Sequence, residues 1–216
     1  MARLRIHNFS VSIDGYGAGP NQSLENPLGE GGLRLHEWVF GTPTFQRSHG
    51  VAGPENATDI DEHFAAIADE NIGATIMGRN MFSPVRGPWH GDAWKGWWGE
   101  NPPFHHPVFV LTHYPRETLS MEGGTTFHFV TGGIREAHER AFEAAAGKDV
   151  RLGGGVATIQ ECLRAGLVDE MHLAIVPVFL GCGERLFDHL DGGPAGLACA
   201  EFIASESVLH VRFQRA

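Results

Sequence analysis

The stretch Asp149-Val150-Arg151-Leu152-Gly153-Gly154-Gly155-Val156-Ala157-Thr158-Ile159 joins two different hydrophobic patterns through three consecutive glycines. The four residues before the glycines are typical of a short strand. After the glycines, Val156, Ile159 and Leu163 recur at helical spacing, and Gly166 is placed to end the helix. The sequence therefore predicts a strand, a tight glycine turn and the start of a helix.

A strand, a glycine turn and a helix start together can form an anion site. Glycine lets the backbone approach a phosphate closely, and the free N–H groups of the first helical turn point toward it. A tight strand-to-helix turn can also need glycine only for a positive φ angle. The pattern by itself leaves a phosphate site and a purely structural turn equally open.

The composition limits the size and class of the protein. The chain has 216 residues, of which 42% are hydrophobic, enough for one sizeable core. It has no internal repeat or low-complexity linker, so we expect residues 1–216 to form a single domain. The 16 basic residues against 26 acidic ones give a net charge of −10, which argues against nucleic-acid binding. A small phosphorylated ligand is not excluded, because it needs only local donors.

Cysteine usage and the N-terminal residues indicate the cellular compartment. Cys162, Cys182 and Cys199 are far apart, odd in number and without a C-x-x-C pair. This favours free thiols in a reducing cytoplasm over a disulfide or zinc framework. The sequence begins without the apolar region of a signal peptide, and no stretch reaches transmembrane length. We therefore expect a cytoplasmic protein that does not bind membranes.

Strand-like and helix-like segments alternate along the chain. Strands are expected at 3–11, 73–77, 107–112, 126–130, 149–152, 170–180, 200–203 and 207–213. Helices are expected at 31–40, after a cap at Thr58 or Asp59, within 78–82, at 133–146 and from 156 onward, with irregular loop at 41–57. The βαβα order in the middle predicts an α/β fold with a mainly parallel sheet and helices on both faces. The last two strands should form an antiparallel hairpin.

Residues 84–106 form a segment rich in tryptophan, proline and histidine. Its tryptophans are Trp89, Trp94, Trp97 and Trp98. Its four prolines disfavour a regular element, so we expect a long surface excursion. The tryptophans could line a substrate pocket, pack a dimer interface or cover the core. His90 and the pair His105–His106 lack a third ligand at fixed spacing, so no metal site is predicted.

Six segments occur in an order that a known family shares. They are Ser12-Ile13-Asp14-Gly15, Thr75-Ile76-Met77-Gly78-Arg79, Pro107-Val108-Phe109-Val110-Leu111-Thr112-His113, Leu152-Gly153-Gly154-Gly155, Leu167-Val168-Asp169-Glu170-Met171-His172-Leu173 and Pro177-Val178-Phe179-Leu180-Gly181-Cys182-Gly183-Glu184-Arg185-Leu186-Phe187. Over nearly the whole chain they resemble the dihydrofolate reductase-like superfamily. The resemblance is greatest to the RibD C-terminal domain family, which is the reductase domain of the bifunctional riboflavin-biosynthesis deaminase-reductase. It implies a dihydrofolate reductase-like fold and an NADPH-dependent reductase.

The resemblance also implies where NADPH would bind. Glycine turns at Gly78 and at Gly153, Gly154 and Gly155 would flank the cofactor pyrophosphate, and Asn80 and Thr158 would add side-chain donors. Further cofactor contacts are implied at Ile13, Gly15, Met77, Leu111, Val156, Ala157 and Thr131.

Arg79, Thr112 and His113 would, by the same resemblance, face the adenosine ribose. A guanidinium suits the doubly charged 2′-phosphate and would favour NADPH over NADH. Arg79 could instead be a solvated surface arginine, and Thr112 could cap its own backbone at the end of the strand. Thr131, with Gly132 and Gly133, could touch the cofactor or only start a helix.

The loop Ile13-Asp14-Gly15 corresponds to the family's mobile loop over the nicotinamide, and the glycines around Tyr16 suit a lid. The alternative is an ordinary surface turn with Asp14 as its Asx residue. Hydride transfer needs few catalytic side chains, because the cofactor supplies the chemistry. The candidates are Asp14 and Glu37, since folate reductases place a carboxylate on the helix after this loop. Glu37 could instead be a solvated glutamate, and aligning the tryptophans puts Leu35 in the place of the acid.

Two positions differ from the riboflavin-pathway reductase. That family typically has a lysine after the Asp-Gly of the first loop and an acid in its glycine turn, both serving a phosphoribosyl substrate. Tyr16 and Gly153 stand there in this chain. The sequence also lacks an H-x-E with a downstream P-C-x-x-C, which excludes a zinc deaminase.

Three functions are compatible with these residues. The first is an NADPH-dependent reductase of a pterin-like or ribosylaminopyrimidine-like heterocycle. The second is a dihydrofolate reductase, and the third is a nucleotide-binding protein without catalysis. Because relatives of this fold often pair through the C-terminal sheet region, we also expect a homodimer.

Overall fold

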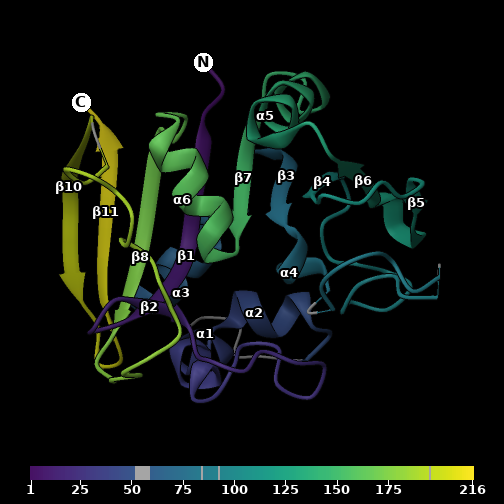
Figure 1. Cartoon of the computed structure of the whole chain (residues 1–216). Coiled ribbons are helices and arrows are strands. Elements are labelled where there is room, and N and C mark those ends of the chain that lie inside the picture. The colour runs from purple at the N-terminus through teal and green to yellow at the C-terminus, as the bar shows by residue number, and fades with distance from the viewer. Residues whose placement is uncertain (52–58, 84, 92, 195) are drawn as a thin grey trace.

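A nine-stranded mixed sheet forms the centre of the molecule (Figure 1). The computed structural model describes residues 1–51, 59–83, 85–91, 93–194 and 196–216. In spatial order the strands are β10 (Leu197–Ala204), β11 (Leu209–Arg215), β8 (Glu170–Val176), β1 (Leu4–Ser12), β7 (Asp149–Gly154), β3 (Ile72–Gly78), β4 (Pro107–Leu111), β6 (Thr126–Val130) and β5 (Leu119–Ser120). All neighbours from β8 to β6 are parallel, whereas β5 and the hairpin β10–β11 are antiparallel. The predicted parallel sheet with a C-terminal antiparallel hairpin is confirmed.

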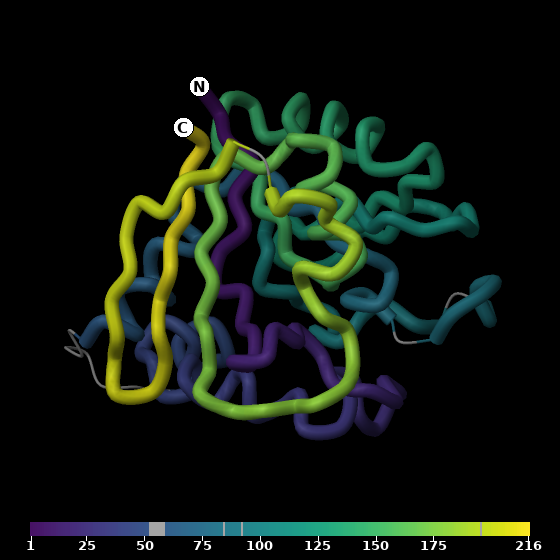
Figure 2. Tube along the Cα trace, turned by 60° about the vertical axis from the view of Figure 1, so that its left-hand side comes forward, coloured from purple at the N-terminus to yellow at the C-terminus, as the bar shows by residue number. Residues whose placement is uncertain are grey.

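Helices cover both faces of this sheet, as predicted. One face carries α5 (Gly133–Ala144) and α6 (Val156–Arg164), and the other carries η1 (Gly32–His36), α1 (Glu37–Phe40) and α3 (Ile60–Ile67). The remaining elements are α2 (Pro43–Ser48), α4 (Arg79–Phe82), η2 (Glu122–Gly124) and a small sheet of β2 (Tyr16–Ala18) and β9 (Glu184–Arg185). Figure 2 shows the hairpin β10–β11 standing at the edge of the sheet opposite to β5 and β6.

Strand β8 shows how the alternating pattern produces two cores. Met171 and Leu173 pack into the main core with α5 and α6, whereas Ala174 and Val176 belong to a second core with Leu35. Because side chains alternate across a strand, a buried central strand is apolar on both sides. The polar residues of β8, Glu170 and His172, are both buried as well.

The structure differs from the predicted elements at several places. The segment predicted as irregular loop contains α2, which starts at Pro43 and is capped by the Thr42 side chain accepting from Phe45 N–H. It is too short to show a helical hydrophobic period. Residues 52–57 of that predicted loop lie outside the described residues, as does the alternative cap Thr58; Asp59 caps α3.

The strand predicted to run to Leu180 ends at Val176. Pro177 follows, and it has no N–H to donate to a strand ladder. The N–H groups of Leu180 and Gly181 instead donate to the Asp14 carboxylate, at 3.2 and 2.8 Å. The segment therefore turns toward the first loop instead of extending the sheet.

The glycine run also differs from the prediction. Strand β7 continues through Gly153 and Gly154, because Gly154 pairs with Met77 of β3. Only Gly155 stands between the strand and α6, and the peptide bond between Gly154 and Gly155 is cis. The glycine turn therefore consists of one residue.

The excursion at 84–106 covers the sheet near β3, β4 and β6. Its described residues form no helix or strand, as the prolines predict. Trp89, Trp94, Trp98 and Phe104 pack against a core cluster around Phe82. Of the three roles considered for the tryptophans, covering the core is the one that these packing contacts support.

A hydrogen-bonded row of side chains is buried beneath α3. The N–H of Asn8, freed from the ladder by a bulge in β1, donates to His172 Nδ1 at 3.1 Å. His172 Nε2 must therefore be protonated and donate to His210 Nδ1 at 3.0 Å, and His210 Nε2 in turn donates to Asp61 at 2.8 Å. Phe64 stacks on both imidazoles. Burial lowers the pKa of both histidines, so both imidazoles are neutral at physiological pH.

This row predicts that the protein loses stability in mild acid. In the unfolded chain the two histidines titrate near 6.5, whereas their folded pKa values are lower. Below that pH the unfolded state binds more protons, so the free energy of unfolding falls as the pH drops from 7 to 5. The variant His210→Gln should make this slope shallower in urea unfolding. His90→Gln, at an exposed position of the excursion at 84–106, should leave the slope unchanged.

Candidate functional site

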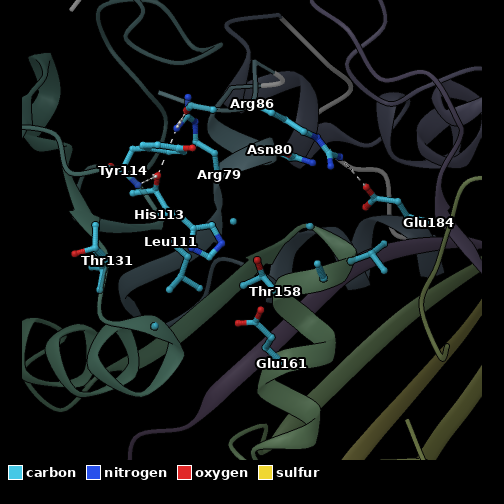
Figure 3. Close-up of a pocket in the computed structure, with 18 residues that line it drawn as sticks. Arg79, Asn80, Arg86, Leu111, His113, Tyr114, Thr131, Thr158, Glu161 and Glu184 are labelled. Atoms are coloured by element: carbon cyan, nitrogen blue, oxygen red, sulfur yellow. Dashed lines mark hydrogen bonds and ion pairs between the residues drawn. The ribbon is translucent and has the colours of Figure 1, made fainter. Parts of the chain in front are cut away.

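A cavity of about 350 Å³ lies at the carboxyl ends of β3, β4, β6 and β7, where ligands commonly bind in open α/β sheets (Figure 3). It collects eleven of the residues predicted to bind the cofactor. They are Gly78, Arg79, Asn80, Leu111, Thr112, His113, Thr131, Gly155, Val156, Ala157 and Thr158. These residues come from four separate stretches of the chain, so the parallel sheet is what brings them together.

Five further predicted contacts do not line this cavity. Met77 is fully buried in the core, directly before Gly78. Gly153 and Gly154 lie in β7 against Met81 and Phe9. Gly15 lies in the first loop, with the adjacent Ile13 side chain exposed. Contact of these residues with a cofactor stays a prediction.

The two predicted glycine turns touch each other. A Cβ atom at Gly78 would overlap the hydroxyl of Thr158 and lie 3.3 Å from the Gly155 nitrogen. The end of β3 and the start of α6 thus approach more closely than any residue with a side chain would permit. This close approach forms the floor of the cavity.

Two of the longer helices, α5 and α6, begin at the cavity. Gly155 precedes α6, and no side chain caps the first N–H groups of that helix among the described residues. Helix α5 begins at Gly133, which also lines the cavity, but the carboxylate of Glu136 folds back beside Gly132. The first turn of α6 is therefore the more available anion site, because its N–H groups lack a competing carboxylate in that turn.

Arg79 is held in the cavity wall by the segment that follows it. Its Nη2 donates to the Val85 carbonyl at 2.9 Å, and its Nη1 lies 3.4 Å from both the Gly87 carbonyl and the Thr112 hydroxyl. The guanidinium also stacks on the ring of Trp89. Burial, together with the charge of Arg116, lowers the pKa of Arg79. Arg79 is thus a fixed wall residue and not a freely solvated surface arginine.

The Thr112 hydroxyl is bound to the backbone next to it. It accepts from Tyr114 N–H at 3.2 Å and donates to the Tyr114 carbonyl at 3.3 Å. This is the capping role considered from the sequence. Thr112 still borders the cavity, so it shapes the wall that presents His113.

Several cavity residues were not predicted from the sequence. Arg86 of the excursion and Glu184 of β9 form an ion pair at 3.6 Å, and Figure 3 shows this pair at one side of the cavity, with Glu161 of α6 on its floor. Tyr114 also lines the wall. Neither periodicity nor a motif marks Arg86 or Glu161, because only the fold brings these segments together.

Asp14 fastens the first loop to the segment after β8. Its carboxylate accepts from Leu180 N–H and Gly181 N–H. Hydrogen bonding from Ser12, with these backbone donors, lowers the pKa of Asp14 to about 2. Asp14 is therefore ionised at neutral pH and is suited to holding the loop; its catalytic role stays a prediction.

The same loop leads to the edge of the cavity. Gly17 of β2 lies so close to Phe9 and Val156 that a Cβ atom would come within 2.9 Å of both. Because Val156 lines the cavity, β2 is packed directly beside it.

Glu37, the other catalytic candidate, lies elsewhere. It is exposed on α1 and borders a second, smaller cavity with Arg34, Trp38 and Val178. The two cavities share no lining residue. The structure therefore does not bring Glu37 together with the predicted cofactor contacts.

Within the described residues, no group of three or more His, Cys, Asp or Glu side chains is arranged to hold a metal ion. None of the described helices is both long enough and apolar enough to cross a membrane.

The RibD C-terminal domain model matches residues 5–205. The chain belongs to this family, whose members are reductase-like domains with a dihydrofolate reductase-like fold. A sequence search among curated proteins finds no match.

Two crystal structures support the fold. A candidate riboflavin biosynthesis protein from Shewanella sp. PV-4 is 24% identical, with a TM-score of 0.59 over 100% of this chain and 99% of that one. A diaminohydroxyphosphoribosylaminopyrimidine deaminase/5-amino-6-(5-phosphoribosylamino)uracil reductase from Thermotoga maritima is 11% identical, with a TM-score of 0.52. This chain is covered completely in that comparison, but only 57% of the Thermotoga chain is.

The contact between the two glycine turns can be tested by filling it. Gly78→Ala should force α6 away from β3 and lower the free energy of unfolding by about 1–3 kcal/mol. Removing the overlapping hydroxyl in Gly78→Ala/Thr158→Ala should restore most of that loss, as measured by urea unfolding. Gly41→Ala is the matched control, because a Cβ atom there meets nothing within 4 Å. Equal stability of Gly78→Ala and the wild type would show that the contact is not tight.

Proposed function

We propose that this protein is an NADPH-dependent reductase of the riboflavin-biosynthesis type, acting on a pterin-like or ribosylaminopyrimidine-like heterocycle. The observation behind this proposal is the cavity at the carboxyl ends of four parallel strands, with a glycine floor and the uncapped start of α6. Membership in a family of reductase-like domains supports the same reaction class.

The residues of the cavity fit a dinucleotide phosphate. The pyrophosphate would lie at the first turn of α6, where Gly155 leaves the backbone N–H groups accessible. The 2′-phosphate would lie on the side of Arg79 and His113. The two carboxylates of the cavity, Glu161 and Glu184, lie on other walls, and Glu184 is already paired with Arg86. Apart from the start of α6, negative charge is therefore favoured on the Arg79 side.

When bound, the nicotinamide supplies the hydride, so the protein has to orient the reactants and exclude water. The loop containing Ile13 and Gly15, fastened through Asp14, would cover that end of the site. Phe9 and Val156, in contact with Gly17, provide an apolar wall there. Tyr16 and Gly153, in place of the lysine and acid of the riboflavin-pathway reductase, favour a heterocycle without a phosphoribosyl group.

Titration with NADPH and NADH tests the cofactor, with energy transfer from tryptophan to nicotinamide as the signal. We expect NADPH to bind at least about tenfold more tightly than NADH, because a guanidinium pairs strongly with the additional phosphate. Arg79→Ala should remove most of this preference and leave NADH binding nearly unchanged. Arg164→Ala, at the far end of α6, is the control for a lost positive charge.

Three outcomes separate the possible functions. Equal loss of NADPH and NADH in Arg79→Ala would contradict the contact with the 2′-phosphate. Binding of NADPH without oxidation by any pterin or ribosylaminopyrimidine would favour a nucleotide-binding protein without catalysis. Tight methotrexate binding together with turnover of dihydrofolate would identify a dihydrofolate reductase instead.

We also propose that the protein is a homodimer paired through β10. This edge strand has apolar residues on both faces, including Ala198, Ala200, Phe202 and Ile203, and most are exposed. An exposed apolar edge strand is normally covered, because its unpaired backbone groups attract another strand. An isologous contact between two copies would cover it.

The dimer can be tested by introducing one charge on this strand. Phe202→Glu should convert the dimer to a monomer in sedimentation-velocity experiments, since burying an unpaired carboxylate is costly. Phe179→Glu is the matched control, because both side chains are 74% exposed and Phe179 lies on a different surface. A wild-type protein that sediments as a monomer at high micromolar concentration would exclude the proposal.

A further inference from the structure

Trp89 does not itself line the candidate cofactor site, but it contacts two residues that do, Arg79 and Tyr114. The Arg79 Cζ atom lies 3.1 Å from the centre of the Trp89 ring. A guanidinium stacked on an indole face is attracted to the ring electrons, and the flat contact fixes its orientation. Since Trp89 covers one side of the guanidinium and Arg79 lines the cavity, the remaining side of the guanidinium is presented to a ligand.

The indole is itself held rigidly. Its Nε1 donates to the Tyr114 carbonyl at 2.9 Å, and its ring makes edge contacts with Phe82 and Phe129 at centroid distances of 5.9 and 5.1 Å. These partners belong to α4, to β6 and to the residues after β4. Trp89 therefore connects the excursion to the three segments that form one wall of the cavity.

The other contacts of Arg79 would not hold it as firmly without the ring. Two of its three hydrogen bonds are long, at 3.4 Å, and its Nε atom is buried without a partner. Arg116 lies near the same indole, with its Cζ atom 4.8 Å from the ring centre, and its charge acts against that of Arg79. The stacking contact counteracts both the weak hydrogen bonding of Arg79 and the repulsion from Arg116, because it attracts the Arg79 guanidinium toward the cavity wall.

We propose that Trp89 is a positioning residue that holds the Arg79 guanidinium toward the cavity and thereby sets the preference for a nucleotide with a 2′-phosphate. The inference rests on the proposed function, since it places the adenosine end of NADPH beside Arg79. If Trp89 acts only through Arg79, replacing Trp89 should weaken only the binding of the phosphate that Arg79 contacts. If Trp89 had a purely structural role, replacing it would weaken the binding of nucleotides with and without that phosphate to the same extent.

Calorimetric titration of the full chain with adenosine 2′,5′-bisphosphate and with 5′-AMP tests this proposal without the nicotinamide site. Trp89→Leu should weaken the bisphosphate about tenfold and 5′-AMP less than about twofold. Trp89→Phe keeps an aromatic face for Arg79 and should retain most of the preference. Trp97→Leu, a tryptophan of the same excursion outside the cavity lining, is the matched control and should bind as the wild type does.

A double-mutant cycle shows whether Trp89 acts through Arg79. In the Arg79→Ala background, Trp89→Leu should not change the ratio of the two affinities further. Equal weakening of both nucleotides by Trp89→Leu, or a further change of the ratio without Arg79, would overturn the proposal.

These results can be distinguished from a failure of the proposed function. A wild type that prefers the bisphosphate but reduces no heterocycle contradicts the reductase and leaves the role of Trp89 supported. A wild type that reduces a heterocycle with NADPH but keeps its preference in Trp89→Leu contradicts the role of Trp89 alone. A wild type that binds neither nucleotide contradicts both.

Discussion

The direct contact between the end of β3 and the start of α6 is the constraint on which the candidate site depends. It requires Gly78, because a Cβ atom there would overlap the hydroxyl of Thr158, and Gly155 begins α6 beside it without a side-chain cap. The contact leaves the first N–H groups of α6 beside the end of β3 and fixes the cavity floor. The other walls follow from the parallel order of the sheet, which brings the end of β4 next to β3 and the end of β6 next to β4.

The excursion at 84–106 positions the charged side chains of the cavity. Without a regular element of its own, it folds over the cluster around Phe82 and delivers Trp89 against Arg79 and Arg86 against Glu184. Its tryptophans thus cover the core and at the same time fix the arginine on the cavity wall. The opposite face of the sheet is held differently, by the hydrogen-bonded row from Asn8 to Asp61 under α3. Although the chain as a whole is acidic, it therefore holds an arginine at the cavity wall, where a phosphorylated ligand would need a positive charge.

Much of the candidate site could be predicted because its residues occur in segments with local signals. Gly78, Thr112 and Thr158 each stand at the end of a strand or the beginning of a helix, and such boundaries are visible in hydrophobic patterns and glycines. Arg86, Glu161 and Trp89 have no such signal. Glu37 is the opposite case. It was a catalytic candidate on a correctly predicted helix, yet it lies at a different cavity. A helix can be predicted from its own residues, but the face that it turns toward a site depends on what it packs against.

The sequence by itself determined the order of strands and helices, the mainly parallel sheet with its antiparallel end, and the family. These follow from side-chain periodicity and from the backbone freedom of glycine, which act over a few residues. Only the tertiary structure decided that β7 continues through Gly154, that the strand after Glu170 stops at Val176, and that Asp14 binds the backbone near Gly181. It also decided which aromatic ring lies beneath Arg79. The end of β8 has a local signal in Pro177, whereas the other features arise from contacts between different segments of the chain, which local composition does not reveal.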